Sequence, residues 1–352
     1  MKKITLLVFI AVFSQYAGSQ EIHVQQKNGL FQKEEDKKIS FHRVAKFEPS
    51  AENRAWSSIT KIMIFGDRVF LLDGRQSKIA VYDINAKFLH SIGRPGQGPG
   101  DLEHPSDFFI TDKEVIYVLN SMAKTIEVFT IRGEFIKRIE IKMPKELYYS
   151  YPSMLLLGDN DEIYIAYSLS PNLIDAYDEN GRYLRTLLKR EDDIMIPGDN
   201  IGNCSQIQFC QDKKAILHFD FFKGLFIKVN KSGDVENKFS VYDKLHDKEI
   251  RAIEDMISET RKQAASSVSI KEFQLWSRCC VDDDNNIYAF SLKKKQAERE
   301  RMYVFSSKGN FLYWQDAPDR IGDLIEDAYC FGDIFIFKTQ NDDLYLTKKG
   351  DE

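Results

Sequence analysis

The chain has 352 residues, of which 12% are aromatic and 29% charged, and its 49 basic and 54 acidic residues give a net charge of −5. This acidic balance argues against nucleic acid and against an anionic membrane surface as partners. The 25 Phe and 16 Tyr residues favour strands over helices.

The first nineteen residues have the three parts of a secretory signal peptide. Lys2 and Lys3 precede an apolar run at 4–13, and the small residues Ala17 and Ser19 follow it. The run is too short to span a bilayer, and no later stretch approaches the roughly 20 apolar residues that a spanning helix needs. We therefore expect a signal peptide at 1–19 and an exported domain at 20–352, soluble in the periplasm or outside the cell.

A template of four short strands recurs along the domain. Its hairpin turns lie at Ala86, Gly133, Gly181, Gly233 and Gly309, at intervals of 47, 48, 52 and 76 residues. The first three intervals are typical of a four-stranded propeller blade, and an insertion accounts for the last. The predicted strands are 61–67, 69–73, 79–83 and 88–92 in the first copy, then 107–110, 115–119, 126–129 and 135–141, then 153–157, 163–167, 173–177 and 183–188, then 206–210, 215–219, 225–229 and 235–239, then 277–281, 287–290, 302–305 and 311–314, and finally 328–331, 334–337 and 344–346.

The sixth copy lacks one strand, and the N-terminus offers a candidate for it. Residues 39–47 alternate between apolar and polar types at the strand period. If this segment is the outer strand of the last blade, it closes the ring and removes an exposed edge. The predicted fold is therefore an all-β six-bladed propeller closed by an N-terminal strand.

The segment from Gly93 to Pro105 has four glycines and three prolines in thirteen positions, so it is a shaped loop. It lies between predicted strands and would join the outer edge of one blade to the inner strand of the next. Together with residues 72–83, it resembles the repeat of the NHL-type six-bladed β-propellers, and the domain is similar to exported bacterial propellers. The resemblance implies a fold, and one fold hosts many activities.

Residues 242–265 interrupt the strand pattern. Leu245, Ile250, Ile253, Met256 and Ile257 fall largely on one helical face, which predicts an amphipathic helix between the fourth and fifth blades. Two interpretations stay open: a helix packed on the rim of the ring, or a lid or docking helix for a partner.

The linker is the first candidate site. Successive glycine amides can form a concavity for an anion or a carbonyl group, and Arg94, Gln97 and His104 would add polar side chains. The competing interpretation is structural, because glycines permit the crossing between blades and prolines stiffen it.

The second candidate is a divalent metal site in the central channel. Resemblance to propeller lyases and lactonases would require acidic, Asn and His side chains from several blades, and Asp73, Asn120, His104 and Asp220 are placed for that role. The six histidines show no metal-ligand spacing, and no nucleophile elbow, phosphate loop or dinucleotide fingerprint is present.

The chain has five cysteines, an odd number for an exported protein. Cys210, Cys280 and Cys330 occupy equivalent places where other copies have apolar residues, which favours buried free thiols. A disulfide within the group, with Cys204 or Cys279 as a possible member, and a metal site are the alternatives.

These observations favour a non-enzymatic binding propeller of the bacterial cell envelope, whose partner is a protein or a small molecule such as a glycan. No cofactor is expected for this function. The alternative is a metal-assisted lyase or hydrolase with its site in the central channel.

Overall fold

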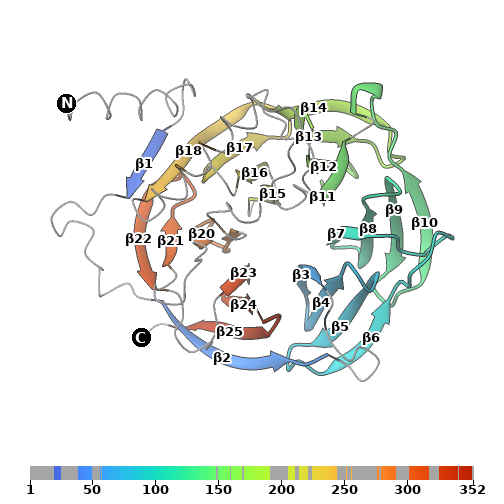
Figure 1. Ribbon diagram of the computed structural model, residues 1–352, viewed down its shortest axis with the longest axis horizontal. Coiled ribbons are helices and arrows are strands. Elements are labelled where there is room, and N and C mark those ends of the chain that lie inside the picture. Colours follow the sequence, from blue (N-terminus) through green and yellow to red (C-terminus); the bar gives the residue numbers. More distant parts are fainter. Residues whose placement is uncertain are drawn as a thin grey trace.

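Six sheets, each with four antiparallel strands, stand around a central axis and form a closed ring in the computed structural model (Figure 1). The structure describes residues 20–24, 39–49, 56, 58–147, 150–158, 160–168, 170–190, 205–210, 214–220, 224–243, 251, 255, 276, 279–290, 301–316, 325–339 and 341–350. The first strand of each blade lies nearest the axis and the fourth lies on the circumference. The six-bladed all-β architecture predicted from the repeat is thus present.

Five blades follow the chain in order. Blade 1 contains β3 (Ile59–Phe65), β4 (Arg68–Asp73), β5 (Lys78–Asp83) and β6 (Phe88–Ile92). Blade 2 contains β7 (Pro105–Ile110), β8 (Val115–Asn120), β9 (Thr125–Thr130) and β10 (Phe135–Glu140). Blade 3 contains β11 (Tyr151–Leu157), β12 (Ile163–Ser168), β13 (Asn172–Tyr177) and β14 (Tyr183–Lys189), and a short 3₁₀ turn, η2 (Lys145–Leu147), precedes it. Blade 4 contains β15 (Ser205–Phe209), β16 (Ala215–Asp220), β17 (Leu225–Asn230) and β18 (Val235–Asp243), and blade 5 contains β19 (Cys280–Val281), β20 (Ile287–Phe290), β21 (Arg301–Phe305) and β22 (Phe311–Asp316).

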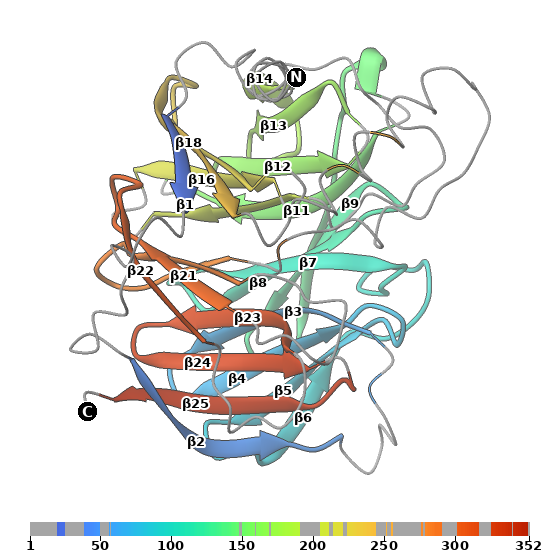
Figure 2. The ribbon, with the colours of Figure 1, turned by 60° about the vertical axis from the view of Figure 1, so that its left-hand side comes forward.

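Blade 6 combines three C-terminal strands with one strand from the N-terminal part of the chain. Its inner strands are β23 (Ile325–Phe331), β24 (Ile334–Thr339) and β25 (Leu344–Gly350), and its outer strand is β2 (Ser40–Phe47). β2 pairs antiparallel with β25, from Ser40 opposite Gly350 to Phe47 opposite Leu344, and the four strands are stacked in Figure 2. The predicted closure by the N-terminal strand is confirmed.

A fifth strand on blade 4 was not predicted. β1 (Gln20–Val24) pairs in parallel with the outer strand β18, with Gln20 opposite Phe239 and Val24 opposite Asp243. The N-terminal segment therefore contacts two blades, blade 4 through β1 and blade 6 through β2 (Figure 1). The sequence pattern of five residues is too short to distinguish an edge strand from a coil.

The core of the ring lies between the blades. Second and third strands are buried on both faces, as in β4, where Val69, Phe70, Leu71 and Leu72 have no exposed surface. The described buried side chains form six clusters, one between each pair of neighbouring blades. The cluster between blades 6 and 1 includes Phe47 of the closing strand β2. Burying one large apolar side chain such as Phe47 contributes about 1.5–3 kcal/mol to the free energy of folding, so the hydrophobic effect is the main source of ring closure.

The hairpin turns used to measure the repeat pack against the preceding blade. All five turn residues have positive φ, from 63° at Ala86 to 99° at Gly233. At Gly181 the approach is closest, because a Cβ there would lie 2.1 Å from the carbonyl oxygen of Glu140 on β10. Glycine is required at this turn by both its φ of 75° and its neighbour.

Two expectations fall largely outside the described residues. The expected signal peptide lies outside them. Within the insertion at 242–265, the described part defines only the end of β18 and the isolated positions Arg251 and Asp255, which have helical backbone and exposed side chains. The inserted helix is therefore not supported as an element and stays a prediction. None of the helices in the described part of the chain is long and apolar enough to cross a membrane.

Candidate functional site

The linker between β6 and β7 is a compact lobe at one end of the ring. Leu102 donates its backbone N–H to the carbonyl of Arg94 at 2.8 Å, and Gly96 donates to the carbonyl of Leu102 at 3.2 Å. The Leu102 side chain is fully buried in the cluster between blades 1 and 2. A Cβ on Gly93 would lie 2.4 Å from Leu102 Cδ1, so the glycine lets this anchor enter the core.

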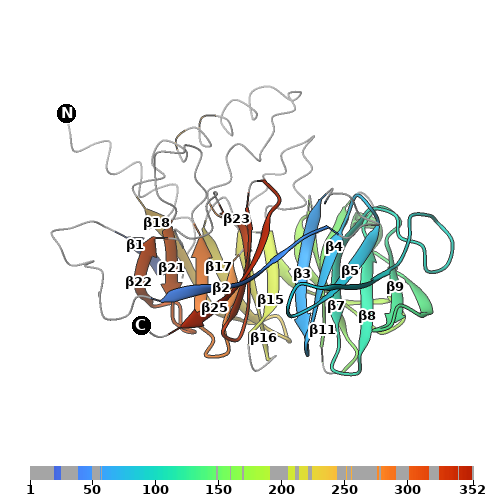
Figure 3. The same ribbon diagram turned by 90° about the horizontal axis from the view of Figure 1, so that it is seen from below.

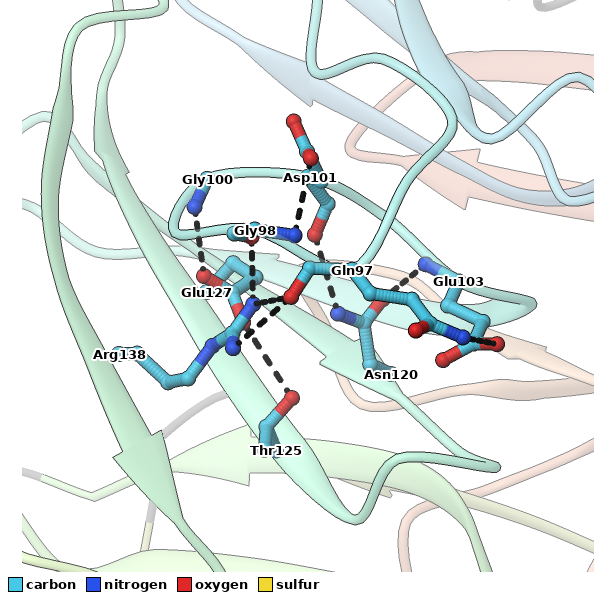
Figure 4. A network of polar contacts seen from close by, with 9 residues as sticks. All are labelled: Gln97, Gly98, Gly100, Asp101, Glu103, Asn120, Thr125, Glu127 and Arg138. Carbon is cyan, nitrogen blue, oxygen red and sulfur yellow. Dashed lines mark hydrogen bonds and ion pairs between the residues drawn. The ribbon is translucent and has the colours of Figure 1, made fainter.

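The inner side of the lobe binds a buried ion pair of blade 2 (Figure 4). Glu127, in the middle of β9, has no exposed surface and forms an ion pair with Arg138 of β10. Its other carboxylate oxygen accepts a hydrogen bond from Gly100 N at 3.0 Å. The Arg138 guanidinium also donates to the carbonyl of Gly98 at 2.6 Å and to that of Gln97 at 3.2 Å. The two side chains thus neutralise each other's charge and also provide hydrogen-bond partners for the backbone of the loop.

Asn120, at the end of β8, holds the C-terminal half of the lobe. Its side-chain oxygen accepts from Glu103 N at 3.1 Å, and its amide donates to the carbonyl of Asp101 at 3.3 Å. Asn120 has only 1% exposure, so its amide is committed to the loop. Of the four residues considered for a metal site, this one has a clear structural role.

Asp101 fixes the outer edge of the lobe. Its carboxylate accepts from Gly98 N at 2.9 Å and from Arg94 Nε at 2.7 Å. The hydrogen bond from Arg94 holds the pKa of Asp101 below its ordinary value, and the hydrogen bond from Gly98 N adds a smaller effect in the same direction. The loop is therefore held in one shape by contacts to blade 2 and by its own carboxylate.

The outer side of the lobe is open to solvent. The Arg94 side chain is 79% exposed although it is paired with Asp101, and Pro95, Gln97, Pro99 and His104 are also exposed. The Gln97 amide donates to Glu103 at 2.8 Å. The three predicted ligand-binding residues, Arg94, Gln97 and His104, thus lie on one preorganised loop that presents hydrogen-bond donors to solvent.

The other residues considered for a metal site have different surroundings. Asp73 is buried at the end of β4, where its carboxylate accepts from Ser58 N at 3.2 Å and Gln76 N at 3.0 Å. Asp220 is partly buried at the end of β16, and His104 is exposed on the linker. Within the described ranges, no three or more His, Cys, Asp or Glu side chains are grouped so that they would hold a metal ion. Asp73 thus acts as a turn residue of blade 1.

A different carboxylate joins the innermost strands of three blades. Asp107 on β7 pairs with Lys61 of β3 at 3.2 Å and accepts a hydrogen bond from Leu155 N of β11 at 2.9 Å. The Asp107 side chain is only 2% exposed and that of Lys61 12%. One side chain therefore links the innermost strands of blades 1, 2 and 3.

Four of the five cysteines are described, each is buried, and none of these four is in a disulfide: Cys210, Cys279, Cys280 and Cys330. The prediction that thiols fill core volume is consistent with their places in the clusters between blades 4 and 5 and between blades 5 and 6. Cys204 lies outside the described residues.

Sequence reasoning missed Glu127, Arg138 and Thr125, whose hydroxyl donates to Glu127. A signal was present, because Glu127 is the one charged residue in the otherwise apolar run from Ile126 to Phe129. A charge in a third strand that is buried on both faces requires a partner. Its partner on the next strand and its contact with the loop depend on register and on the path of the linker.

Comparison with known proteins agrees with this architecture. A family model described as a six-bladed β-propeller, DUF5128, matches residues 31–167. No curated protein matches the chain in sequence.

Solved structures are similar in fold at low sequence identity. A protein of Bacteroides fragilis described as exported has a TM-score of 0.59 and 13% identity, over 94% of this chain and 98% of that chain. A member of the DUF4221 family from Bacteroides vulgatus has a TM-score of 0.60 and 11% identity, over 89% of this chain and 98% of that one. Virginiamycin B lyase of Staphylococcus aureus is more distant, with a TM-score of 0.49 and 13% identity over 82% and 80% of the two chains, and carries no argument about activity. The chain is an all-β six-bladed propeller built on four-stranded blades, and these likenesses concern its fold.

Proposed function

We propose that this protein is an exported, non-enzymatic binding propeller of the cell envelope, whose ligand contacts the end of the ring that carries the linker lobe. The observation that carries the proposal is the division of the lobe into two sides. Its inner side is saturated by Glu127, Arg138 and Asn120, whereas its outer side presents Arg94 and His104 to solvent. A loop whose conformation is fixed in advance loses little entropy when it binds.

Other strands that precede long intervals in the chain also end on this side of the ring. In an antiparallel blade of four strands, two connections leave from the same end of the ring. One joins the second strand to the third, and the other is the linker to the next blade. The first strand of each blade begins at this end. The connections after β14, β18, β20 and β22 belong to these two classes. The side view of Figure 3 shows the strands running between the two ends of the ring. Binding residues are commonly found on loops that a rigid scaffold positions.

The exposed groups limit the chemistry of the ligand. Arg94 and Gln97 provide N–H donors, and the neighbouring prolines provide rigid apolar surface. Carboxylates and sugar hydroxyls complement such a surface, the first by charge-assisted hydrogen bonds to the guanidinium. We therefore expect an acidic oligosaccharide or a peptide carboxylate rather than a purely apolar compound.

The test is a thermal-shift screen of residues 20–352 against acidic and neutral oligosaccharides and peptides with free carboxylates. Compounds that raise the Tm are then titrated calorimetrically against Arg94→Ala and His104→Ala. A matched control is Lys113→Ala, because Lys113 is also 79% exposed and ion-paired, with Asp161 at 3.6 Å, but lies in the turn between β7 and β8 at the other end of the ring. The proposal expects at least a tenfold loss of affinity in the linker variants with unchanged Tm; equal affinity in all three variants would refute it.

A metal-assisted lyase or hydrolase is the alternative. Asp73, Asn120 and Asp220 end the second strands of blades 1, 2 and 4, and this shared position is what supports a site in the channel. Metal analysis of protein purified without an affinity tag, together with Tm values with and without a chelator, tests this alternative. A stoichiometric divalent ion whose removal lowers the Tm would favour it over the binding function.

A further inference from the structure

Two of the buried cysteines face each other across the boundary between blades 5 and 6. Cys280 lies on β19 and Cys330 on β23, the innermost described strands of the two blades. Cα atoms of these strands approach to within 8 Å, and both side chains belong to one core cluster. The two thiol groups are also within hydrogen-bonding reach of each other.

This placement brings two thiols into contact, which a cross-link requires. A disulfide needs Cα atoms roughly 4.4–6.8 Å apart and side chains directed toward each other, and a pair of thiols in mutual contact meets the second condition. Cys210 and Cys279 belong to the neighbouring cluster, between blades 4 and 5. The contact between the thiols of Cys280 and Cys330 therefore joins blade 5 to blade 6.

We infer that Cys280 and Cys330 form a disulfide when the protein folds in an oxidising compartment, and that this bond ties blade 5 to blade 6. The inference rests on export, which is part of the proposed function, and not on the identity of the ligand. Blade 6 is the blade that β2 completes. The bond therefore lies next to the closure of the ring and opposes its opening.

The step is a thiol–disulfide exchange. Each thiol loses its proton, one bond forms between the two Sγ atoms, and the electron pair reduces the disulfide of an envelope thiol oxidoreductase or of oxidised glutathione. The oxidant's S–S bond breaks, and its two sulfurs take up the protons. Burial raises the pKa of both thiols, so the attacking thiolate is scarce in the closed ring, and exchange requires the boundary between blades 5 and 6 to open and close again around the pair.

The experiment refolds fully reduced protein, residues 20–352, with a mixture of reduced and oxidised glutathione. The product is unfolded, alkylated with iodoacetamide and mapped by peptide mass spectrometry. We expect a peptide in which Cys280 is joined to Cys330. Alkylation of both Cys280 and Cys330, or a bond from either of them to another cysteine, would overturn the inference.

Variants give a second readout. The oxidised protein should melt roughly 6 °C above the same protein refolded without oxidant, because the bond closes a loop of about 50 residues. Cys330→Ala should abolish this difference, whereas Cys210→Ala, which also removes a buried thiol, should retain it. An oxidation-dependent rise that persists in Cys330→Ala would contradict the pairing. The mapping of wild-type protein does not depend on either variant and requires no ligand, so it can fail independently of the proposed binding function.

Discussion

Arg138→Ala removes the cation from a carboxylate that has no exposed surface. Glu127 is 0% exposed and the Arg138 side chain 30%, so the variant leaves a buried charge without its counter-ion. It also removes the hydrogen bonds to the carbonyls of Gln97 and Gly98. Breaking a buried pair in this way costs about 3–5 kcal/mol, and the partial exposure of Arg138 places the expected loss in the free energy of unfolding near 3 kcal/mol.

The assay is urea denaturation followed by tryptophan fluorescence, with Arg185→Ala as the matched control. Arg185 is also paired with a glutamate, Glu162, through two hydrogen bonds at 2.9 and 3.0 Å, but their side chains are 36% and 23% exposed. We expect a loss of about 1 kcal/mol there, since solvent screens the pair. The double variant Glu127→Gln/Arg138→Ala should recover much of the stability, because it removes the stranded charge. A loss for Arg138→Ala no greater than that for Arg185→Ala would refute this account of the linker.

Three further substitutions test the ring. Gly181→Ala should lower the free energy of unfolding by roughly 3 kcal/mol, because the new Cβ would meet the backbone of Glu140. The control Gly66→Ala should lower it by about 1 kcal/mol, because a Cβ there has nothing within 4 Å. Equal losses in urea denaturation would exclude the close contact. Phe41→Ala removes a ring that packs edge-on against two rings of β24, at centroid distances of 5.0 and 5.3 Å. We expect the free energy of unfolding to fall by about 3 kcal/mol in the same assay. A loss below 1 kcal/mol would argue against closure by β2. Burial raises the pKa of Asp175, so its contribution to stability is complete below the unfolded pKa and is lost as the pH rises through the folded pKa. The Tm of Asp175→Asn relative to wild type should therefore rise from acidic to neutral pH, and a flat difference would contradict the shift.

The sequence predicted the blades because their signal is repeated. Each blade alternates short apolar strands with turns, and the positive φ at Gly133, Gly181 and Gly233 explains why glycine marks the period. The closing strand β2 was also predictable, since a sixth copy with three strands leaves an edge that residues 39–47 can cover.

The candidate site was predictable only in part. Composition identified the linker and its exposed Arg94, but the buried contacts of the lobe come from strands 17–41 residues further along the chain. The pairing of Glu127 with Arg138 depends on the register of β9 and β10, in which Glu127 lies opposite Arg138. The contact between Cys280 and Cys330 likewise depends on how neighbouring blades face each other, which no local pattern records.

Hydrogen–deuterium exchange of the complex with the tightest compound from the screen tests the central claim most directly. The account predicts slower exchange in peptides that cover Gly93 to Pro105, with no change in the turn that contains Lys113. Protection confined to the Lys113 end of the ring, with the linker unchanged, would contradict it.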